Sequence, residues 1–262
     1  MRIITWNINS VRLRMPLLRK LAEETMPDVI CLQETKVVDE LFPHGEIEDL
    51  FPYRQINGIK AYNGVAILSK RPFQSGGAQN WCDRADGRHV FVRFAGGLEI
   101  HNFYVPAGGD VPDPAENPKF AHKLEFLDEM TEWWTGHARP DAKRVLVGDL
   151  NIAPGKHDVW SHKQLLDVVS HTPVEVERLD RLQKTHDWVD AARLFVPEDE
   201  KLYSWWSYRA RDWRASNRGR RLDHIWVTPA LQAKLEKFEI LAEARDWQRA
   251  SDHVPVIVDI AV

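Results

Sequence analysis

Val145-Leu-Val-Gly-Asp-Leu-Asn-Ile-Ala-Pro154 is the stretch that decides the fold, because its apolar run ends abruptly on polar side chains. The apolar residues predict a short buried strand, and Gly148 interrupts it. Asp149 and Asn151 stand two positions apart, so we expect both to project from the same side of an extended chain. A carboxylate and a carboxamide side by side at a strand end suit a metal ion, a water molecule or a phosphate. The alternative is an ordinary Asx turn after the strand.

Strands and helices alternate along the rest of the chain. We predict helices over 12–25, around 120–130 and over 176–186, and the first should turn Leu13, Leu17, Leu18 and Leu21 inward. Further strands are predicted at 1–6, 29–32, 64–69, 89–94, 98–105, 222–227 and 254–260. No long linker, low-complexity tract or internal repeat separates them. The sequence therefore predicts one α/β domain spanning residues 1–262.

Composition limits the classes of protein to which the chain can belong. The 262 residues carry a net charge of −4, so any attraction to nucleic acid has to come from a local basic surface. Cys31 and Cys82 are too few for a disulfide scaffold or a thiolate metal site, which favours a reducing compartment. No signal-peptide series opens the chain, and no apolar run approaches the roughly 20 residues of a membrane span. We expect a soluble, cytoplasmic protein without a membrane partner.

Polar residues recur where the predicted strands end. In layered α/β folds such ends meet at one edge, where loops converge over a rigid sheet. The set contains oxygen donors and one histidine but no thiolate, which indicates Mg²⁺, with Mn²⁺ as a substitute, over zinc. The candidate residues are Asn7, Glu34, Tyr104, Asp149, Asn151, Asp223, Asp252 and His253.

Three of these residues have distinct expected roles. Glu34 follows the strand at 29–32 and is the principal candidate for the metal carboxylate. Asn7 could ligate the metal or hold Glu34 in place. In Ser251-Asp-His253, a carboxylate stands beside an imidazole and before a strand. A carboxylate fixes the tautomer of an imidazole and raises its affinity for a proton, which suits a histidine that contacts phosphate.

The segment from Trp205 to Arg221 is strongly basic, although the whole chain has a net negative charge. It contains six arginines, one acidic residue and four aromatic residues. Guanidinium groups pair with phosphates, and flat rings stack on or wedge beside bases. A solvated arginine-rich loop is the alternative. As residues that bind DNA we single out Trp205, Arg209, Arg211, Arg218 and Arg220.

Several motifs together resemble the exonuclease III family of abasic-site endonucleases, within the endonuclease/exonuclease/phosphatase superfamily. They run in order over nearly the whole chain: Trp6-Asn-Ile-Asn9, Leu32-Gln-Glu-Thr35, Tyr104-Val-Pro-Ala-Gly-Gly109, Gly148-Asp-Leu-Asn-Ile-Ala153, Trp205-Trp-Ser-Tyr-Arg209, Asn217-Arg-Gly-Arg-Arg-Leu-Asp223 and Ser251-Asp-His253. The Gln-Glu-Thr and Ser-Asp-His motifs belong to the wider superfamily. The Tyr104 motif and the 205–223 segment separate DNA-repair members from phosphatases of small molecules.

The resemblance implies a fold and an activity. The fold is a four-layer α/β sandwich, resembling DNase I, of two mixed sheets flanked by helices. The activity is Mg²⁺-dependent cleavage of double-stranded DNA 5′ to abasic sites, with 3′→5′ exonuclease or 3′-end-cleaning activity at blocked 3′ ends. No obligate protein partner is implied, and a monomer is expected.

The resemblance also implies roles for single residues. Asp149 falls on the water-activating carboxylate, Asn151 on its transition-state partner and Tyr104 on the active-site tyrosine. Asp223, Asp252 and His253 fall on the supporting acid and the Asp–His pair. Trp205 falls on a wall of the abasic-sugar pocket, and Arg220 stands where some members carry an apolar or aromatic residue. The metal ligands are to be drawn from Asn7, Glu34, Asp149, Asn151, Asp252 and His253.

Two other functions remain open at this point. A superfamily phosphatase for a small phosphorylated molecule would keep Glu34, Asp149 and His253 but would not need the arginine-aromatic segment. A non-catalytic nucleic-acid-binding protein would keep that segment but would not need the acids.

Overall fold

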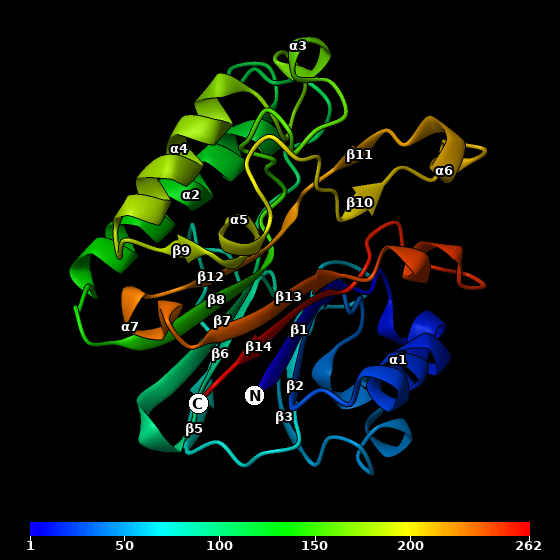
Figure 1. Ribbon diagram of the computed structural model, residues 1–262, viewed down its shortest axis with the longest axis vertical. Coiled ribbons are helices and arrows are strands. Elements are labelled where there is room, and N and C mark those ends of the chain that lie inside the picture. The colour runs from blue at the N-terminus through cyan, green and yellow to red at the C-terminus, as the bar shows by residue number, and fades with distance from the viewer.

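The computed structural model describes residues 1–262, and its central feature is a pair of six-stranded β-sheets packed face to face. Helices cover the outer face of each sheet (Figure 1). Each sheet is mixed, with one parallel pair of strands at its centre: β1 with β2 in the first sheet and β7 with β8 in the second. The four-layer α/β sandwich predicted from the sequence is confirmed.

The strands of both sheets have the following bounds in their spatial order. The first sheet contains β13 (Leu235–Ile240), β14 (Val256–Ile260), β1 (Arg2–Asn7), β2 (Val29–Gln33), β4 (Val65–Ser69) and β3 (Tyr53–Asn57). The second contains β5 (Ser75–Gly77), β6 (His89–Arg93), β7 (Leu98–Tyr104), β8 (Lys143–Asp149), β12 (Asp223–Val227) and β9 (Val189–Asp190). A separate two-stranded ribbon joins β10 (Trp205–Trp206) to β11 (Gly219–Arg220).

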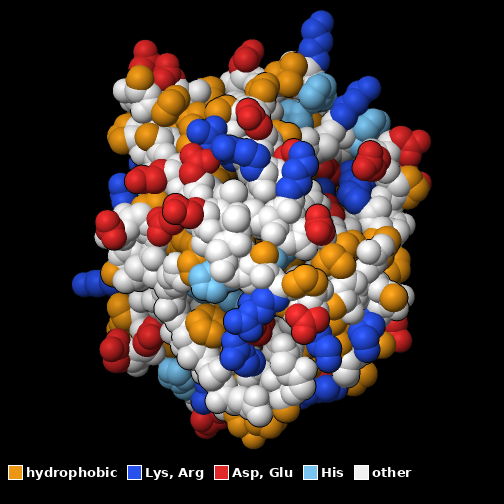
Figure 2. All heavy atoms as spheres, turned by 90° about the vertical axis from the view of Figure 1, so that its left-hand side faces the viewer, with side chains coloured by type: hydrophobic (Ala, Val, Ile, Leu, Met, Phe, Trp, Pro, Cys, Tyr) orange, Lys and Arg blue, Asp and Glu red, His pale blue; other side chains and the backbone are white.

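Seven helices accompany the strands. They are α1 (Val11–Thr25), α2 (Pro118–Gly136), α3 (His162–Leu165), α4 (Pro173–Lys184), α5 (Ala191–Phe195), α6 (Trp213–Ser216) and α7 (Pro229–Gln232). None of them is long and apolar enough to span a lipid bilayer. The outer face that α2 and α4 cover mixes acidic and basic side chains (Figure 2), with ion pairs such as Arg178–Asp128. This face therefore offers no extended basic surface.

Alternating side chains of the strands build three apolar layers. Val145 and Val147 of β8 point into the core between the sheets, whereas Leu146 between them points outward, under α2 and α4. In the same way Ile3 of β1 joins the central core and Ile4 packs under α1. Burial on both faces explains why these strands read as continuous apolar runs in the sequence.

The first helix corrects one expectation from the sequence. Leu18 and Leu21 are buried as predicted, but Leu13 is 50% exposed. The helix loses regular geometry at Arg14, which has φ −115° and ψ 18°, because Pro16 inside the helix removes a backbone donor. Arg14 turns inward instead, and its guanidinium donates to backbone carbonyls, including that of Ala250 at 3.1 Å.

The two ends of the sandwich differ in chemistry. Strands β1, β2, β7 and β8 end at one edge of the two sheets, and β12 begins at the same edge because it pairs antiparallel with β8. All eight polar residues that the sequence places at strand ends gather there. The two chain termini lie at the other end of the sandwich (Figure 1).

Candidate active site

The polar strand ends surround a cavity of about 710 Å³ between the sheet edge and the β10–β11 ribbon. Six of the eight predicted strand-end residues line it, namely Glu34, Tyr104, Asp149, Asn151, Asp252 and His253. Asn7 and Asp223 lie behind them, fully buried or nearly so. The structure thus brings together residues from both sheets and from the loop before β14.

Asn7 at the end of β1 joins the two central carboxylates. Its amide nitrogen Nδ2 donates to Glu34 Oε1 and to Asp149 Oδ2, each at 2.9 Å. Its amide oxygen accepts from the backbone N–H of Asn9 at 3.1 Å. In this orientation Asn7 holds the carboxylates in place and has its oxygen engaged. The geometry favours the positioning role over direct ligation of a metal.

Glu34 sits in the left-handed region, with φ 52°, directly after β2. Its Oε1 also accepts from the Tyr104 hydroxyl at 2.9 Å, and its Oε2 lies 2.7 Å from Lys36 Nζ. Burial acts to raise the pKa of Glu34, but the hydrogen bonds from Asn7 and Lys36 outweigh it and lower that pKa. Burial raises the pKa of Tyr104 well above its usual value, and the charge of Glu34 adds to the effect, so Tyr104 is a proton donor.

Asp223, His253 and Asp149 form a buried chain of hydrogen bonds and charges. His253 Nδ1 lies 2.8 Å from Asp223 Oδ2, and His253 Nε2 lies 3.6 Å from Asp149 Oδ2. Ser204 fixes Asp223 by donating its hydroxyl to Oδ2 at 2.6 Å. Burial lowers the proton affinity of His253, but Asp223 and Asp149 overcome it and raise the pKa of His253 to about 10. His253 is therefore a cation at neutral pH and presents Nε2–H toward Asp149.

Asp149 combines deep burial with a central position. It is 1% exposed, and burial is the main reason that its pKa rises from 3.8 to about 7, against the opposing charge of His253. Such a carboxylate is a stronger base than an ordinary aspartate. It faces the cavity from the end of β8, within reach of a water molecule bound there.

Asn151 reaches the cavity by a different route from the one predicted. Strand β8 ends at Asp149, and Asn151 has φ 54°, so the two residues do not share one extended segment. The backbone N–H of Asn151 donates to Asp149 Oδ1 at 2.9 Å, which is the Asx turn considered as the alternative. The Asn151 amide donates to Val105 O at 2.9 Å, so the side chain is fixed beside Asp149.

Asp252 links the catalytic end of the cavity to its aromatic wall. Its Oδ2 accepts from the indole N–H of Trp205 at 3.0 Å, and its Oδ1 accepts from Asn9 Nδ2 at 3.1 Å. An isolated β-bridge also pairs Trp205 with His253. Both carboxylate oxygens of Asp252 are thus engaged in holding neighbouring residues.

The predicted basic residues divide into two groups. Arg209, Arg218 and Arg220 line the cavity together with Trp205, and the Arg218 guanidinium lies 4.7 Å from the ring centroid of Trp160. Arg211 is exposed beyond the cavity, near the tip of the β10–β11 ribbon. Three of the four arginines therefore face the space in which a substrate would bind.

The donor set suits a divalent cation that prefers oxygen. Ligand atoms of Asp149, Asp223 and His253 all lie within 4.8 Å of one another, and Glu34 is joined to Asp149 through Asn7. A protonated His253 is a poor ligand. Glu34, Asp149 and Asp252 are carboxylates that line the cavity, and Asn7 joins the first two, so Glu34 and Asp149 are the pair best placed for one ion. Carboxylates are typical ligands of Mg²⁺ and Mn²⁺.

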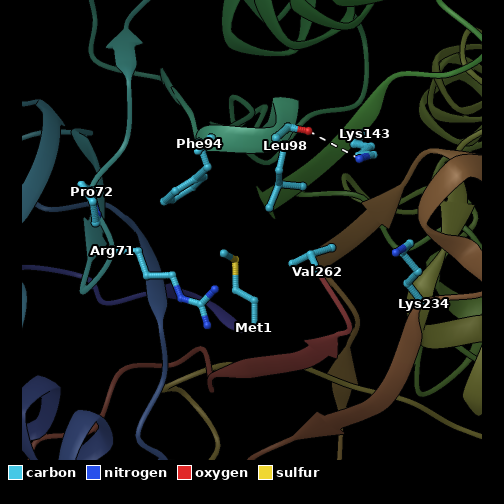
Figure 3. A pocket seen from close by; sticks show the side chains of 10 residues that line it. Met1, Arg71, Pro72, Phe94, Leu98, Lys143, Lys234 and Val262 are labelled. Carbon is cyan, nitrogen blue, oxygen red and sulfur yellow. Dashed lines mark hydrogen bonds between the residues drawn. The ribbon is translucent and has the colours of Figure 1, made fainter.

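A second hollow, of about 410 Å³, lies at the opposite end of the sandwich (Figure 3). Met1, Phe94 and Leu98 form an apolar floor, and Arg71, Lys143 and Lys234 stand around it. It contains no carboxylate side chain and none of the residues singled out from the sequence. The chemistry therefore belongs to the larger cavity.

Sequence reasoning missed four residues of the site. Lys36 pairs with Glu34, Ser204 fixes Asp223, Asn9 holds Asp252 and Trp160 lines the cavity. Asn9 lies within one of the motifs quoted above and Ser204 directly precedes another, so their place in the sequence could have identified them. Nothing in the sequence identified Trp160, because it lies in a loop outside the quoted motifs and does not follow a predicted strand.

Comparison with known proteins places the chain among nucleases. A model of the Endonuclease/Exonuclease/phosphatase family matches residues 4–253. Exodeoxyribonuclease III of Haemophilus influenzae is 30% identical and Exodeoxyribonuclease of Bacillus subtilis is 32% identical, each over 98% of both chains. Among solved structures, an AP endonuclease from Archaeoglobus fulgidus has a TM-score of 0.92 and 27% identity. The 3′ phosphatase NExo from Neisseria, bound to a product DNA hairpin, has a TM-score of 0.91 and 29% identity; both cover 100% of each chain.

Proposed function

Because the chain belongs to the endonuclease/exonuclease/phosphatase family and is a DNA-repair nuclease, we propose that it cleaves duplex DNA 5′ to abasic sites. We propose that it also removes groups that block 3′ ends. The observation that carries this proposal is the position of the Asp149–His253–Asp223 chain, which opens into a cavity walled by Trp205 and arginines. A catalytic acid–base set next to a surface for a polyanion suits a DNA phosphodiester.

The residues of the site divide the work of hydrolysis. Asp149, with its raised pKa, takes a proton from the attacking water, and Asn151 orients that water or a phosphate oxygen. His253, held as a cation by Asp223, donates Nε2–H to the phosphate, and Tyr104 donates its hydroxyl. Oriented donors of this kind typically contribute about 10²–10³-fold each in rate.

Mg²⁺ is the metal we propose, with Mn²⁺ as a substitute. Glu34 would hold it, with Asp149 as the second carboxylate and Asn7 fixing both. When bound, the cation supplies a positive charge that stabilises developing negative charge on oxygen. The Lys36 ammonium, 2.7 Å from Glu34 Oε2, would share this carboxylate with the cation.

The abasic site is favoured by the shape and lining of the cavity. Trp205, Trp160 and Leu222 give it apolar walls beside the catalytic residues, which suits a sugar without a base. Extruding a nucleotide that lacks a base costs less than extruding a normal one, because no stacking is lost. The arginines of the cavity would contact the DNA backbone and would not depend on a base.

The remaining expectations follow from the same site. We propose one catalytic domain over residues 1–262, since both sheets and the loop before β14 contribute to a single cavity. We also propose that the protein acts as a monomer without an obligate protein partner. Cys31 and Cys82 are both free thiols, which suits the reducing cytoplasm.

A cleavage assay with defined duplexes tests the proposal. Purified protein is incubated with a labelled duplex that carries one abasic site, with Mg²⁺, with Mn²⁺ and with EDTA, beside an undamaged duplex. We expect one cut that leaves a 3′-hydroxyl, only in the presence of metal, and no cut by an Asp149→Asn variant purified in parallel. Release of phosphate from small phosphate esters without DNA cleavage would instead identify a phosphatase. Binding of the duplex without any cut would identify a non-catalytic DNA-binding protein.

A further inference from the structure

Arg220 occupies a distinctive place in the cavity wall. It belongs to β11, is paired with Trp205 across the β10–β11 ribbon, and its guanidinium carbon lies 5.3 Å from the Trp205 ring centroid. Its Nη1 donates to Val169 O at 2.9 Å and to Ser170 Oγ at 2.6 Å, which fixes the side chain against the segment before α4. The guanidinium is therefore held between the Trp205 ring and the Val169–Ser170 segment in the lining of the cavity.

The charge of Arg220 has no carboxylate partner. Its neighbour Arg221 makes ion pairs with Asp158 and Asp190, at 2.8 Å and 2.7 Å, and serves the structure. The carboxylate that acts on Arg220 from nearby is Glu175, and this group is already paired with Lys123. The Arg220 Nε is buried without a hydrogen-bond partner. The Arg220 side chain is partly buried and lines the cavity, and a partly desolvated cation without a counter-charge is stabilised by a ligand that supplies one.

The reaction determines which part of a substrate meets this cation. Water adds to phosphorus as the bond to the 3′-oxygen breaks, and that oxygen takes up a proton. Any group that is esterified to the phosphate through another oxygen stays on the phosphate and leaves together with it. Asp149, His253, Trp205 and Arg220 all line the same cavity, so this substituent would meet the aromatic and cationic part of the lining.

We infer that Arg220 is a specificity-determining residue that selects 3′-blocking groups bearing their own negative charge, such as the carboxylate of a 3′-phosphoglycolate. This inference rests on the proposed function. An abasic sugar is uncharged and gains nothing from the guanidinium. A bare 3′-phosphate lacks the glycolate carboxylate, so it is the reference for the hydrolytic chemistry without that group.

The test compares three duplexes that share the same upstream sequence. In the first this strand ends in a 3′-phosphate, in the second it ends in a 3′-phosphoglycolate, and in the third it continues through an abasic site. The values of kcat/KM are measured for the wild-type protein and for R220M, R220K and R218M. We expect R220M to lower kcat/KM for the phosphoglycolate about tenfold to a hundredfold more than for the 3′-phosphate, the usual effect of losing a hydrogen bond to a charged group. R220K keeps the charge and should retain more phosphoglycolate activity than R220M.

R218M is the matched control, because it removes another arginine from the same cavity. It should lower kcat/KM for the phosphoglycolate and the phosphate by one common factor. An equal loss on both duplexes in R220M would overturn the inference and leave Arg220 as a cross-link between β11 and the Val169–Ser170 backbone. A wild-type protein that cleaves neither the abasic nor the 3′-phosphate duplex would instead refute the proposed function. The 3′-phosphate activity and the melting temperature of each variant confirm that it is folded.

Discussion

Asp149→Asn should make the protein more stable while it removes most of the activity. Burial raises the pKa of this carboxyl from 3.8 to about 7, so at pH 8 the charged form is disfavoured in the folded state relative to the unfolded state. The difference between these two pKa values corresponds to about 4 kcal/mol of free energy that opposes folding. A neutral side chain of the same size escapes that cost.

Asparagine cannot accept all the hydrogen bonds that Asp149 accepts, which reduces the expected increase in the free energy of unfolding. The carboxylate accepts from the Asn151 backbone N–H and from Asn7 Nδ2, each at 2.9 Å. An amide has only one acceptor oxygen, so one of these donors is left without a partner at a cost of about 1–3 kcal/mol. The net expectation is a stabilisation of about 1–3 kcal/mol.

Urea unfolding at pH 8 in EDTA, followed by tryptophan fluorescence, measures this difference. The gain should shrink as the pH falls from 8 toward 5, because the wild-type carboxyl then takes up a proton in the folded state. In Mg²⁺, single-turnover cleavage of an abasic duplex should fall by roughly 10²–10⁴-fold, as expected for the loss of a general base. Binding of the duplex should change little.

Asp158→Asn is the matched control, and we expect it to lower the stability of the protein where Asp149→Asn raises it. Asp158 is as buried as Asp149, but Arg221 and Arg193 outweigh burial and hold its pKa below the usual range. Breaking this buried network should destabilise the protein by about 3–5 kcal/mol. The reasoning fails if Asp149→Asn is less stable than the wild type. It also fails if the variant cleaves within a few-fold of the wild-type rate, which would remove Asp149 from the role of general base.

Three further predictions follow from the same structure. Glu34→Ala should lose most activity at low Mg²⁺ while remaining folded, and a metal titration equal to that of the wild type would contradict the metal assignment. Neutralising Arg209, Arg211 and Arg218 should weaken DNA binding and flatten the slope of log affinity against log salt by about one for each phosphate that is no longer neutralised; an unchanged slope would make them a solvated surface. Burial lowers the pKa of His224 from 6.5 to about 4, so the unfolded chain binds the extra proton between these values and stability falls as the pH drops through that window. His224→Gln should reduce this dependence of the free energy of unfolding on pH by up to about 1.4 kcal/mol per pH unit, and an unchanged dependence would refute the reasoning.

The buried parts of the fold were predictable from the sequence, and its edges were not. Strands such as β2 and β8 are apolar on both faces, and their runs stand out. The edge strands β3 and β13 were missed, because β13 has charged residues such as Glu236 and Lys237 facing solvent and shows no long apolar run. The misjudged Leu13 has a local origin instead, because Pro16 lies inside the helix and its regular geometry is lost at Arg14, which shifts the inward-facing positions from those of an unbroken helix.

Within the site, residue identity was more predictable than geometry. Polar residues at strand ends marked six side chains that line the cavity, but this pattern did not mark Trp160 or Lys36. Whether Asn7 holds carboxylates or ligates a metal depended on where its amide points, which no sequence pattern encodes. The left-handed backbone at Glu34 and Asn151 is likewise a property of the turn in three dimensions.

The hydrogen bond between Asn7 and Asp149 joins residues 142 positions apart and belonging to different sheets. Strand β1 pairs with β14, which lies more than 240 positions further along the chain, and His253 stands just before β14. A nascent or half-folded chain therefore holds acids and bases that have not yet met. Cleavage activity would therefore appear only after β14 has been made and the two sheets have docked, so the rate at which cleavage returns in a refolding experiment measures the docking of the two sheets.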